Sequence, residues 1–294
     1  MKGQSKRGRL HMLYAIITLI AALAISQGTA EAETTNCTAI TTLPYTISAQ
    51  GIYCLNSDLT TGITSGSAIT IATNNVTIDL NGRKLGGLAA GAGTGAYGIY
   101  AYQKKNITIR NGSIRGFYWG IRLYDFSPYT TSSGHLIEDI RADGNTFAGI
   151  QVIGTGNIIR NNQVVNTGGS TVSGSTNASG IYAAGPGSSI VNNDITNTVE
   201  QTGGSSHSVY ANTCNGCSIE NNRVSNSAAG PSGSYGVYII GSTNNLTAVN
   251  NRISTVDVGI GYYSSSTGKY RDNLTGADVT TPYLGGTAIG TTNN

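Results

Sequence analysis

The chain has 294 residues, a formal net charge of +3 and only 11% charged residues. Four of its 17 Lys and Arg residues and one of its 14 Asp and Glu residues fall within residues 1–32, so the remainder carries 13 of each and no net charge. With no basic run beyond Lys104-Lys105, this remainder lacks the positive surface that binds nucleic acid or an anionic membrane.

Residues 1–32 have the pattern of a secretory signal peptide. Four basic residues precede an apolar run from Leu13 to Ala24, and Ala30-Glu31-Ala32 offers a small-x-small cleavage site. The run is too short for a good membrane span, although an uncleaved anchor stays the alternative. Cleavage after Ala32 leaves a mature chain of 262 residues, and we expect this chain to be extracellular or periplasmic and free of the membrane.

A repeat begins near residue 66 and continues to about 275. Gly followed by Ile or Val recurs, as do Asn-Asn pairs spaced 31, 29 and 29 residues apart. The motif glycines are Gly98, Gly120, Gly149, Gly180, Gly236 and Gly259, with a degenerate copy at Ser208, and the pairs are Asn161-Asn162, Asn192-Asn193, Asn221-Asn222 and Asn250-Asn251. A fixed period of this size predicts a solenoid. Apolar residues alternate with period two, which predicts strands with one buried face.

The Asn pairs suit the corners between the strands of such a coil. Asn tolerates the left-handed backbone that a sharp turn requires. Identical polar side chains that stack in register can also bond from one coil to the next. Length and the absence of an internal linker indicate one solenoid domain, and we expect it to be a monomer.

Four cysteines are expected to be oxidised after export. A bridge from Cys54 to Cys214 would have to span about six coils, or about 29 Å at roughly 4.8 Å per coil, far beyond the ~7 Å that Cα atoms of a bridge allow. The prediction is therefore Cys37–Cys54 and Cys214–Cys217. A zinc site at the second pair would need more ligands, and only His135 and His207 remain in the mature chain. No metal and no cofactor is predicted.

The segments 75–82 (NVTIDLNG) and 105–112 (KNITIRNG) resemble repeats of right-handed parallel β-helix proteins. That superfamily includes pectate lyases, polygalacturonases, alginate lyases and mannuronan epimerases. The resemblance implies an all-β, right-handed parallel β-helix with three faces over residues 66–275. A disulfide-clamped cap at 33–65 would precede it, and 276–294 would form a tail or cap over the last coil.

The resemblance is weaker for activity, because one fold carries many different sites. Polygalacturonase motifs survive only as the fragments Asn193-Asp194 and Gly134-His135-Leu136, and the Asp-Pro-His motif of the epimerases is absent. Calcium stays an open alternative. A pectate lyase binds it with a cluster of acidic residues, and the candidates for such a cluster in this chain are Glu138, Asp139 and Asp143. Strand alternation would send Glu138 and Asp139 to opposite faces.

Reading the outward position of each Gly-Ile strand coil by coil gives a stripe of aromatic residues. The apolar faces of such rings can pack against the C–H groups of sugars, and the Tyr hydroxyls can hydrogen-bond to the hydroxyl groups at the edge of the sugar ring. We therefore predict a polysaccharide partner; the expected binding residues are Tyr100, Tyr102, Gln151, Tyr182, Tyr210 and Tyr238. The alternative is an aromatic ladder that merely stiffens the sheet.

Residues 104–143 hold ten of the 26 charged side chains of the mature chain. Elimination or epimerisation of a uronic acid requires a cation for the carboxylate, a base and an acid. Arg122 could neutralise the carboxylate, and Tyr124 or His135 could exchange protons. Asp125 could orient His135. The alternative is a solvated charged segment with local salt bridges.

The sequence thus predicts a secreted β-helix that engages a polysaccharide along the Tyr stripe. Uronate lyase or epimerase activity near residues 99–125 is the catalytic form of this hypothesis. The competing form is a non-catalytic surface or matrix protein, such as an adhesin, in which the stripe is an interaction or stacking surface.

Overall fold

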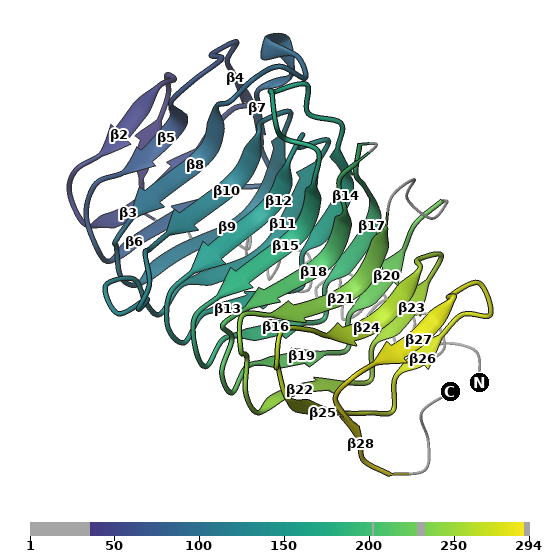
Figure 1. The fold of residues 1–294 in the computed structure, drawn as a ribbon. Helices are drawn as coiled ribbons and strands as arrows, with labels where there is room; N and C mark the ends of the chain where they lie inside the picture. The colour runs from purple at the N-terminus through teal and green to yellow at the C-terminus, as the bar shows by residue number, and fades with distance from the viewer. Residues whose placement is uncertain (1–35, 202, 228–232, 291–294) are drawn as a thin grey trace, which may run out of the picture. The chain divides into compact units, whose positions relative to one another are not determined.

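A computed structural model describes residues 36–201, 203–227 and 233–290. The predicted signal peptide lies outside these residues. From Cys37 onward the chain forms one compact unit, in which each strand pairs in parallel with strands one coil away (Figure 1). The expected all-β parallel β-helix is confirmed.

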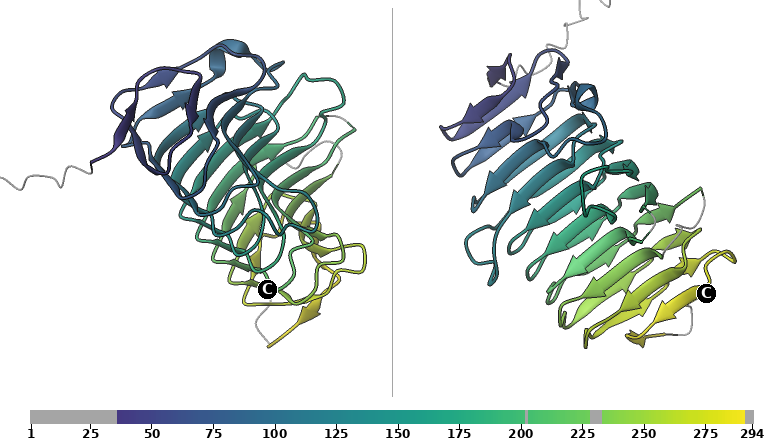
Figure 2. Two further views of the ribbon diagram at one scale, coloured as in Figure 1. Left: turned by 90° about the vertical axis from the view of Figure 1, so that its left-hand side faces the viewer. Right: turned by 45° about the horizontal axis from the view of Figure 1, so that its top comes forward.

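Each coil contributes strands to three parallel ladders. Among the described residues one ladder is a separate ten-stranded sheet. Its strands are β2 (Tyr45–Ile47), β5 (Ser67–Ile71), β8 (Tyr97–Tyr102), β10 (Trp119–Tyr124), β12 (Ala148–Ile153), β15 (Ala178–Ala184), β18 (Ser206–Asn212), β21 (Ser234–Ile240), β24 (Val258–Tyr262) and β27 (Thr281–Leu284). The successive strands of this sheet lie side by side in both views of Figure 2.

The other two ladders merge into one sheet, because two long strands run through both of them. These strands are β9 (Ile107–Arg115) and β11 (Leu136–Asp143). The second ladder also contains β1 (Thr38–Ile40), β3 (Gly51–Leu55), β6 (Val76–Asp79), β13 (Ile158–Arg160), β16 (Ser189–Val191), β19 (Ser218–Glu220), β22 (Leu246–Val249), β25 (Gly268–Arg271) and β28 (Thr287–Ala288). The third also contains β4 (Leu59–Thr60), β7 (Lys84–Gly86), β14 (Gln163–Gly168), β17 (Asp194–Val199), β20 (Arg223–Ser225), β23 (Arg252–Ser254) and β26 (Leu274–Thr275). A single 3-10 turn, η1 (Leu88–Ala90), interrupts the described β structure.

These ladders extend beyond residues 66–275 at both ends. Strand β2 pairs with β5 and β1 with β3, so the segment 33–65 supplies strands of the first coil. Strand β27 pairs with β24 in the same way, and the segment after 275 continues the stack. The cap and tail therefore use the same pairing as the repeats.

The interior contains a column of aliphatic side chains, one from each strand of the ten-stranded sheet from β5 to β24, with Tyr45 and Tyr283 at its two ends. Ile99, Ile121 and Ile150 lie opposite one another in register and are completely buried. The repeated glycine also points inward: a Cβ on Gly149 would lie 2.5 Å from Val164 Cγ1 and 2.8 Å from the carbonyl oxygen of Gly180. No larger residue fits there, which explains why Gly recurs before Ile.

In five consecutive coils, from Asn162 to Asn273, a buried Asn at one corner bonds to the Asn of the next coil. Asn193 donates from its backbone N–H and from Nδ2 to Oδ1 of Asn222, at 2.9 and 3.0 Å, and Nδ2 also donates to the carbonyl of Ile159 at 2.9 Å. The same pattern joins Asn162, Asn193, Asn222, Asn251 and Asn273. The residue before each of the first four is an Asn with φ between 54° and 57°. The predicted left-handed corners and stacked amides are both confirmed.

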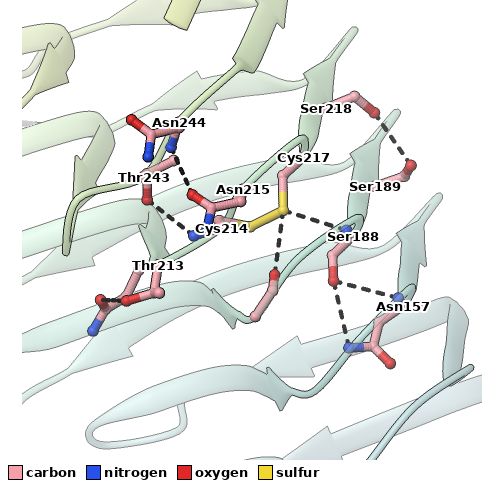
Figure 3. The surroundings of a disulfide bond; sticks show 12 residues. Asn157, Ser188, Ser189, Thr213, Cys214, Asn215, Cys217, Ser218, Thr243 and Asn244 are labelled. Carbon is pink, nitrogen blue, oxygen red and sulfur yellow. Dashed lines mark hydrogen bonds between the residues drawn. A yellow bond between two sulfur atoms is a disulfide. The ribbon is translucent and has the colours of Figure 1, made fainter. Parts of the chain in front are cut away.

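A second corner uses mixed side chains for the same purpose. The backbone N–H of Asn157 donates to Ser188 Oγ at 3.3 Å, and the N–H of Ser188 donates to Cys217 Sγ at 3.3 Å (Figure 3). On the next coil the N–H of Cys214 donates to Thr243 Oγ1 at 2.9 Å. The Cys214–Cys217 disulfide therefore occupies a corner where other coils use Asn or Ser.

Both predicted disulfides are present. The Cα atoms of Cys37 and Cys54 are 5.8 Å apart, and those of Cys214 and Cys217 are 5.5 Å apart. In the part of the chain that the structure describes, no helix is long and apolar enough to span a membrane.

Replacing one amide of the Asn corner tests its contribution to stability. Asn193→Ala leaves the buried N–H of Asn162 and the carbonyl of Ile159 without their side-chain partner. We expect the free energy of unfolding to fall by about 2 kcal/mol or more, since unpaired buried polar groups cost about 1–3 kcal/mol each. Urea denaturation measures the change. The control Asn56→Ala alters an exposed Asn and should cost less than about 0.5 kcal/mol; equal effects of the two variants would contradict the role of the corner.

Candidate functional site

The outward surface of the ten-stranded sheet carries three columns of side chains, which together we call the aromatic face. The middle column is the predicted stripe, and its members lie opposite one another in register: Tyr100, Arg122, Gln151, Tyr182, Tyr210 and Tyr238. The first column consists of Tyr97, Trp119, Ala148, Ser179, His207 and Tyr235. The third consists of Tyr102, Tyr124, Ile153, Ala184, Asn212 and Ile240.

Sequence reasoning missed the first column. Strict alternation from Ile121 would place Trp119 inside, yet Gly120 and Ile121 both point inward and Trp119 is half-exposed. The close approach of backbone at each repeated glycine breaks the alternation, so the residue before it points outward. The sequence signal that could have revealed this column is the aromatic residue directly before the motif glycine, as at Tyr97, Trp119 and Tyr235.

Aromatic rings on this face contact one another along the solenoid. The Tyr182 and Tyr210 centroids are 4.6 Å apart, and those of Tyr210 and Tyr238 are 5.4 Å apart. The rings of both pairs are tilted, at 44° and 37° to one another, so they are in contact along the column without lying flat on each other. Open ring faces are left where the column is interrupted.

The interruption lies at the coil of β12, where the three columns contribute Ala148, Gln151 and Ile153. None of these residues carries a ring. A hollow of about 390 Å³ opens over this coil. Its lining is largely aromatic: Trp119, Tyr124, Asp125, Phe126, Ser127, Tyr129, Phe147, Gln151, Ile153 and Tyr182. The row of consecutive tyrosines in the middle column begins at Tyr182, and the Tyr182 side chain lines the C-terminal side of the hollow.

Three polar atoms beside the hollow have no hydrogen-bond partner among the described residues. They are Trp119 Nε1, Gln151 Oε1 and Arg122 Nε, two donors and one acceptor. Gln151 is only 3% exposed, so its side chain is fixed beneath the hollow. Burial also raises the pKa of Tyr182, and its hydroxyl stays protonated at neutral pH. These three atoms are themselves buried from solvent, so the hollow presents mainly apolar ring faces, with the Tyr hydroxyls and the buried Gln151 amide among its polar groups.

Arg122 lies in a cage of aromatic rings. Its guanidinium carbon is 4.1 Å from the ring centre of Trp119, 4.4 Å from that of Tyr124 and 5.1 Å from that of Tyr97. Nη1 donates to the Tyr97 hydroxyl at 3.0 Å. Within the described ranges, no carboxylate forms an ion pair with it. The structure therefore brings Arg122 and Tyr124 together, and the rings compensate the half-buried charge.

Asp125 holds the loop that borders the hollow. Its carboxylate, 1% exposed, accepts hydrogen bonds at 2.9 Å from the backbone N–H groups of Phe126, Thr131 and Ser132. Burial alone would raise the pKa of Asp125, but these bonds and one from Gln103 hold it below its ordinary value. The carboxylate is thus fully engaged in anchoring residues 125–132.

His135 belongs to the second corner ladder and is not among the residues that line the hollow. Its Nδ1 accepts a bond from the N–H of Ile107 at 3.2 Å, so the proton lies on Nε2, 2.7 Å from Ser132 Oγ. The ring is 1% exposed, and burial lowers its pKa to about 4. Asp125 reaches His135 only through Ser132. This geometry gives His135 a structural role in the coil.

Four of the eight remaining charged residues in 104–143 form ion pairs on the other two faces: Arg110, Glu138, Arg141 and Asp143. Arg110 pairs with Asp79 at 3.0 Å and Glu138 with Arg160 at 2.7 Å. Asp139 sits at a corner with φ of 53°, so alternation breaks there and both it and Glu138 point outward. The expectation that they face opposite sides was wrong. Within the described part of the chain, no three His, Cys, Asp or Glu side chains come together.

The anchor of the loop gives a measurable prediction. In Asp125→Asn, buried backbone donors lose carboxylate acceptors, at a cost of about 1–3 kcal/mol to the closed loop. Trp119, the single tryptophan of the chain, should then emit at longer wavelength while the β-sheet circular dichroism stays unchanged.

The pH dependence of the same signal follows from the lowered pKa of Asp125. The folded-state pKa lies below the ordinary value of 3.8, so the anchor is complete above that pH and is lost as pH falls through the lower folded value. The emission should be constant from neutral pH to about pH 4 and change only below it. Asp58→Asn, which breaks an exposed pair with Lys84, is the control. A spectrum of Asp125→Asn identical to that of the wild type would contradict the anchoring role.

No family model matches this sequence, and no curated protein is similar to it. Among solved structures, the Dettilon tailspike protein aligns with 84% of the chain at 12% identity and a TM-score of 0.50. The chain spans 60% of the length of that tailspike. An alginate lyase from a Paenibacillus species (16% identity, 83% of this chain and 99% of that one) and the pectate lyase Pel9A (14%, 81% and 68%) both align with a TM-score of 0.42. At such identities, the tailspike alignment supports the β-helix fold alone.

Proposed function

We propose that this protein is a secreted β-helix that binds a polysaccharide on the aromatic face, with one sugar ring held in the hollow over β12. The observation that carries the proposal is the hollow over the coil of β12, which contributes no ring to the three columns while the coils on both sides of it do. A pyranose ring has two apolar C–H faces and a polar rim. It matches a hollow lined by aromatic rings, in which Ser127 and three tyrosines also carry hydroxyl groups.

Charge on the face also favours a binding role. The one carboxylate that lines the hollow, Asp125, is occupied by backbone donors. Arg122 lies beside the hollow, packed against the rings of Trp119 and Tyr124, which both line it, and a guanidinium there favours a sugar that carries hydroxyl or carboxylate groups. Tyr100, Tyr102, Tyr210 and Tyr238 extend the same surface to either side, and the Asn212 Nδ2 donor lies 3.4 Å from the Tyr182 hydroxyl.

A glycan-array screen of the mature chain, followed by titration of Trp119 fluorescence with the best glycan, tests the proposal. Tyr182→Ala removes one wall of the hollow and should weaken binding about tenfold, since an aromatic contact contributes about 0.5–1.5 kcal/mol. Tyr182→Phe keeps the ring and should stay within about threefold.

Arg252→Ala is the control: it removes a polar side chain from β23, on a different face of the solenoid, and should leave glycan affinity unchanged. The proposal fails when the array gives no signal. It also fails when Tyr182→Ala binds as tightly as the wild type.

A second candidate function is elimination or epimerisation of a uronate polymer. The observation in its favour is the Arg122 guanidinium, which forms no ion pair with a carboxylate of the described residues and lies 4.4 Å from the ring centre of Tyr124. It could neutralise a substrate carboxylate next to a phenol that exchanges a proton. Incubation with pectate and with alginate should then yield ultraviolet-absorbing unsaturated products, and Arg122→Ala should reduce the rate about 10²-fold or more. Absence of product from the wild type would dismiss catalysis and leave the binding proposal intact.

A further inference from the structure

A second aromatic cluster lies on the aromatic face, on the C-terminal side of the hollow. Its members come from three consecutive coils: His207, Tyr210, Tyr235, Tyr238 and Tyr263. The Tyr238 and Tyr263 centroids are 4.6 Å apart, and those of Tyr235 and Tyr238 are 4.8 Å apart. We call this group the tyrosine platform.

His207 ties the rings of the platform together. It is 7% exposed and stacks at 4.9 Å and 22° on Tyr210 and at 5.4 Å and 20° on Tyr235. Its Nδ1 has no hydrogen-bond partner in the described part of the chain. A ring buried at the contact of two coils fixes the relative positions of the tyrosines around it, so the platform is a rigid surface.

The platform carries no charge at neutral pH. Burial lowers the pKa of His207 to about 4, against the opposite effect of Glu200. Burial likewise raises the pKa of Tyr210 and of Tyr263 to about 12. Neutral rings with hydroxyl edges suit the apolar C–H faces and the hydroxyl groups that neutral and acidic sugars share.

Tyr263 completes the middle column beyond Tyr238. The member of that column after Tyr238 is Gly261, and a Cβ built on Gly261 would lie 2.4 Å from the Tyr263 ring. The Tyr263 ring therefore fills the place that the glycine leaves empty. From Tyr182 to this ring the column advances three coils, about 14 Å at roughly 4.8 Å per strand spacing.

A sugar ring in an extended chain advances by about as much as one strand spacing. The coil of β12 and that of Tyr263 are separated by four strand spacings. We propose that the bound glycan is an extended chain of about five or more sugars that runs along the solenoid axis, with one ring in the hollow and its other end on the tyrosine platform at Tyr263. This inference rests on the proposed function, because it assigns the length and direction of the ligand at that site. Linking the two subsites in one ligand makes the second contact intramolecular and raises affinity.

Titration of Trp119 fluorescence with oligosaccharides of two and six sugars tests the inference. The probes are size-defined oligosaccharides of cellulose, of pectate and of alginate. In at least one series the six-sugar ligand should bind the wild type at least about tenfold more tightly than the two-sugar ligand. Tyr263→Ala should reduce the six-sugar affinity to the two-sugar level and leave two-sugar binding unchanged. Tyr263→Phe should behave as the wild type, and circular dichroism with thermal melting checks that each variant is folded.

The outcomes separate this inference from the proposed function. Equal affinity for two and six sugars, or six-sugar binding that Tyr263→Ala leaves intact, overturns the axial chain and leaves binding in the hollow standing. When none of the three series changes the fluorescence, the axial chain is overturned; the proposed function fails as well when the glycan array gives no signal. If Tyr263→Ala does not fold, the comparison of Tyr263→Phe with Tyr263→Leu, in which the side chain stays large but loses its ring, decides the same point.

Discussion

The structure depends on one constraint: every backbone N–H that turns inward at a corner of the coil needs a hydrogen-bond acceptor. Within the strands, sheet pairing provides hydrogen-bond partners for the backbone N–H and C=O groups. At a corner the chain leaves the sheet, and a buried N–H without an acceptor costs about 1–3 kcal/mol. The protein supplies the acceptor from the next coil. Asn222 serves Asn193 in this way, and Ser188 serves Asn157. Each coil thereby fixes the register of the coil before it.

Register in turn determines the aromatic face. Because corners of successive coils are bonded to one another, the outward positions of the ten-stranded sheet align, and rings from different coils meet at stacking distance. A slip of one residue would send these side chains inside. The hollow is a consequence of the same order: where one coil contributes Gln151 and Ile153 in place of rings, the aligned walls on either side leave a slot of defined width. The loop after β10 then closes one edge of it through the buried carboxylate of Asp125.

Much of this arrangement could be predicted from the sequence. The period, the alternation and the Asn pairs were enough for the β-helix, for both disulfides and for the middle column, because each depends on local pattern. Tyr97, Trp119 and Tyr235 were missed, since the inward glycine that follows each of them breaks the alternation. His135 looked like a candidate base among charged residues, yet it serves as a corner acceptor, a role that only the stacking of coils creates. Phe126 and Tyr129 also line the hollow, but they lie in the loop between β10 and β11, outside the repeat, so the period of the sequence could not place them.

Amide hydrogen exchange of the native protein tests the central claim most directly. Turn amides on a surface usually exchange fast, whereas amides bonded to a buried side chain of the next coil are exposed only by larger opening. The backbone N–H groups of Asn162, Asn193 and Asn222 should therefore exchange as slowly as those of the core strands, such as Ile150. Exchange of these corner amides at the rate of exposed turn amides, with the strands still protected, would contradict the account.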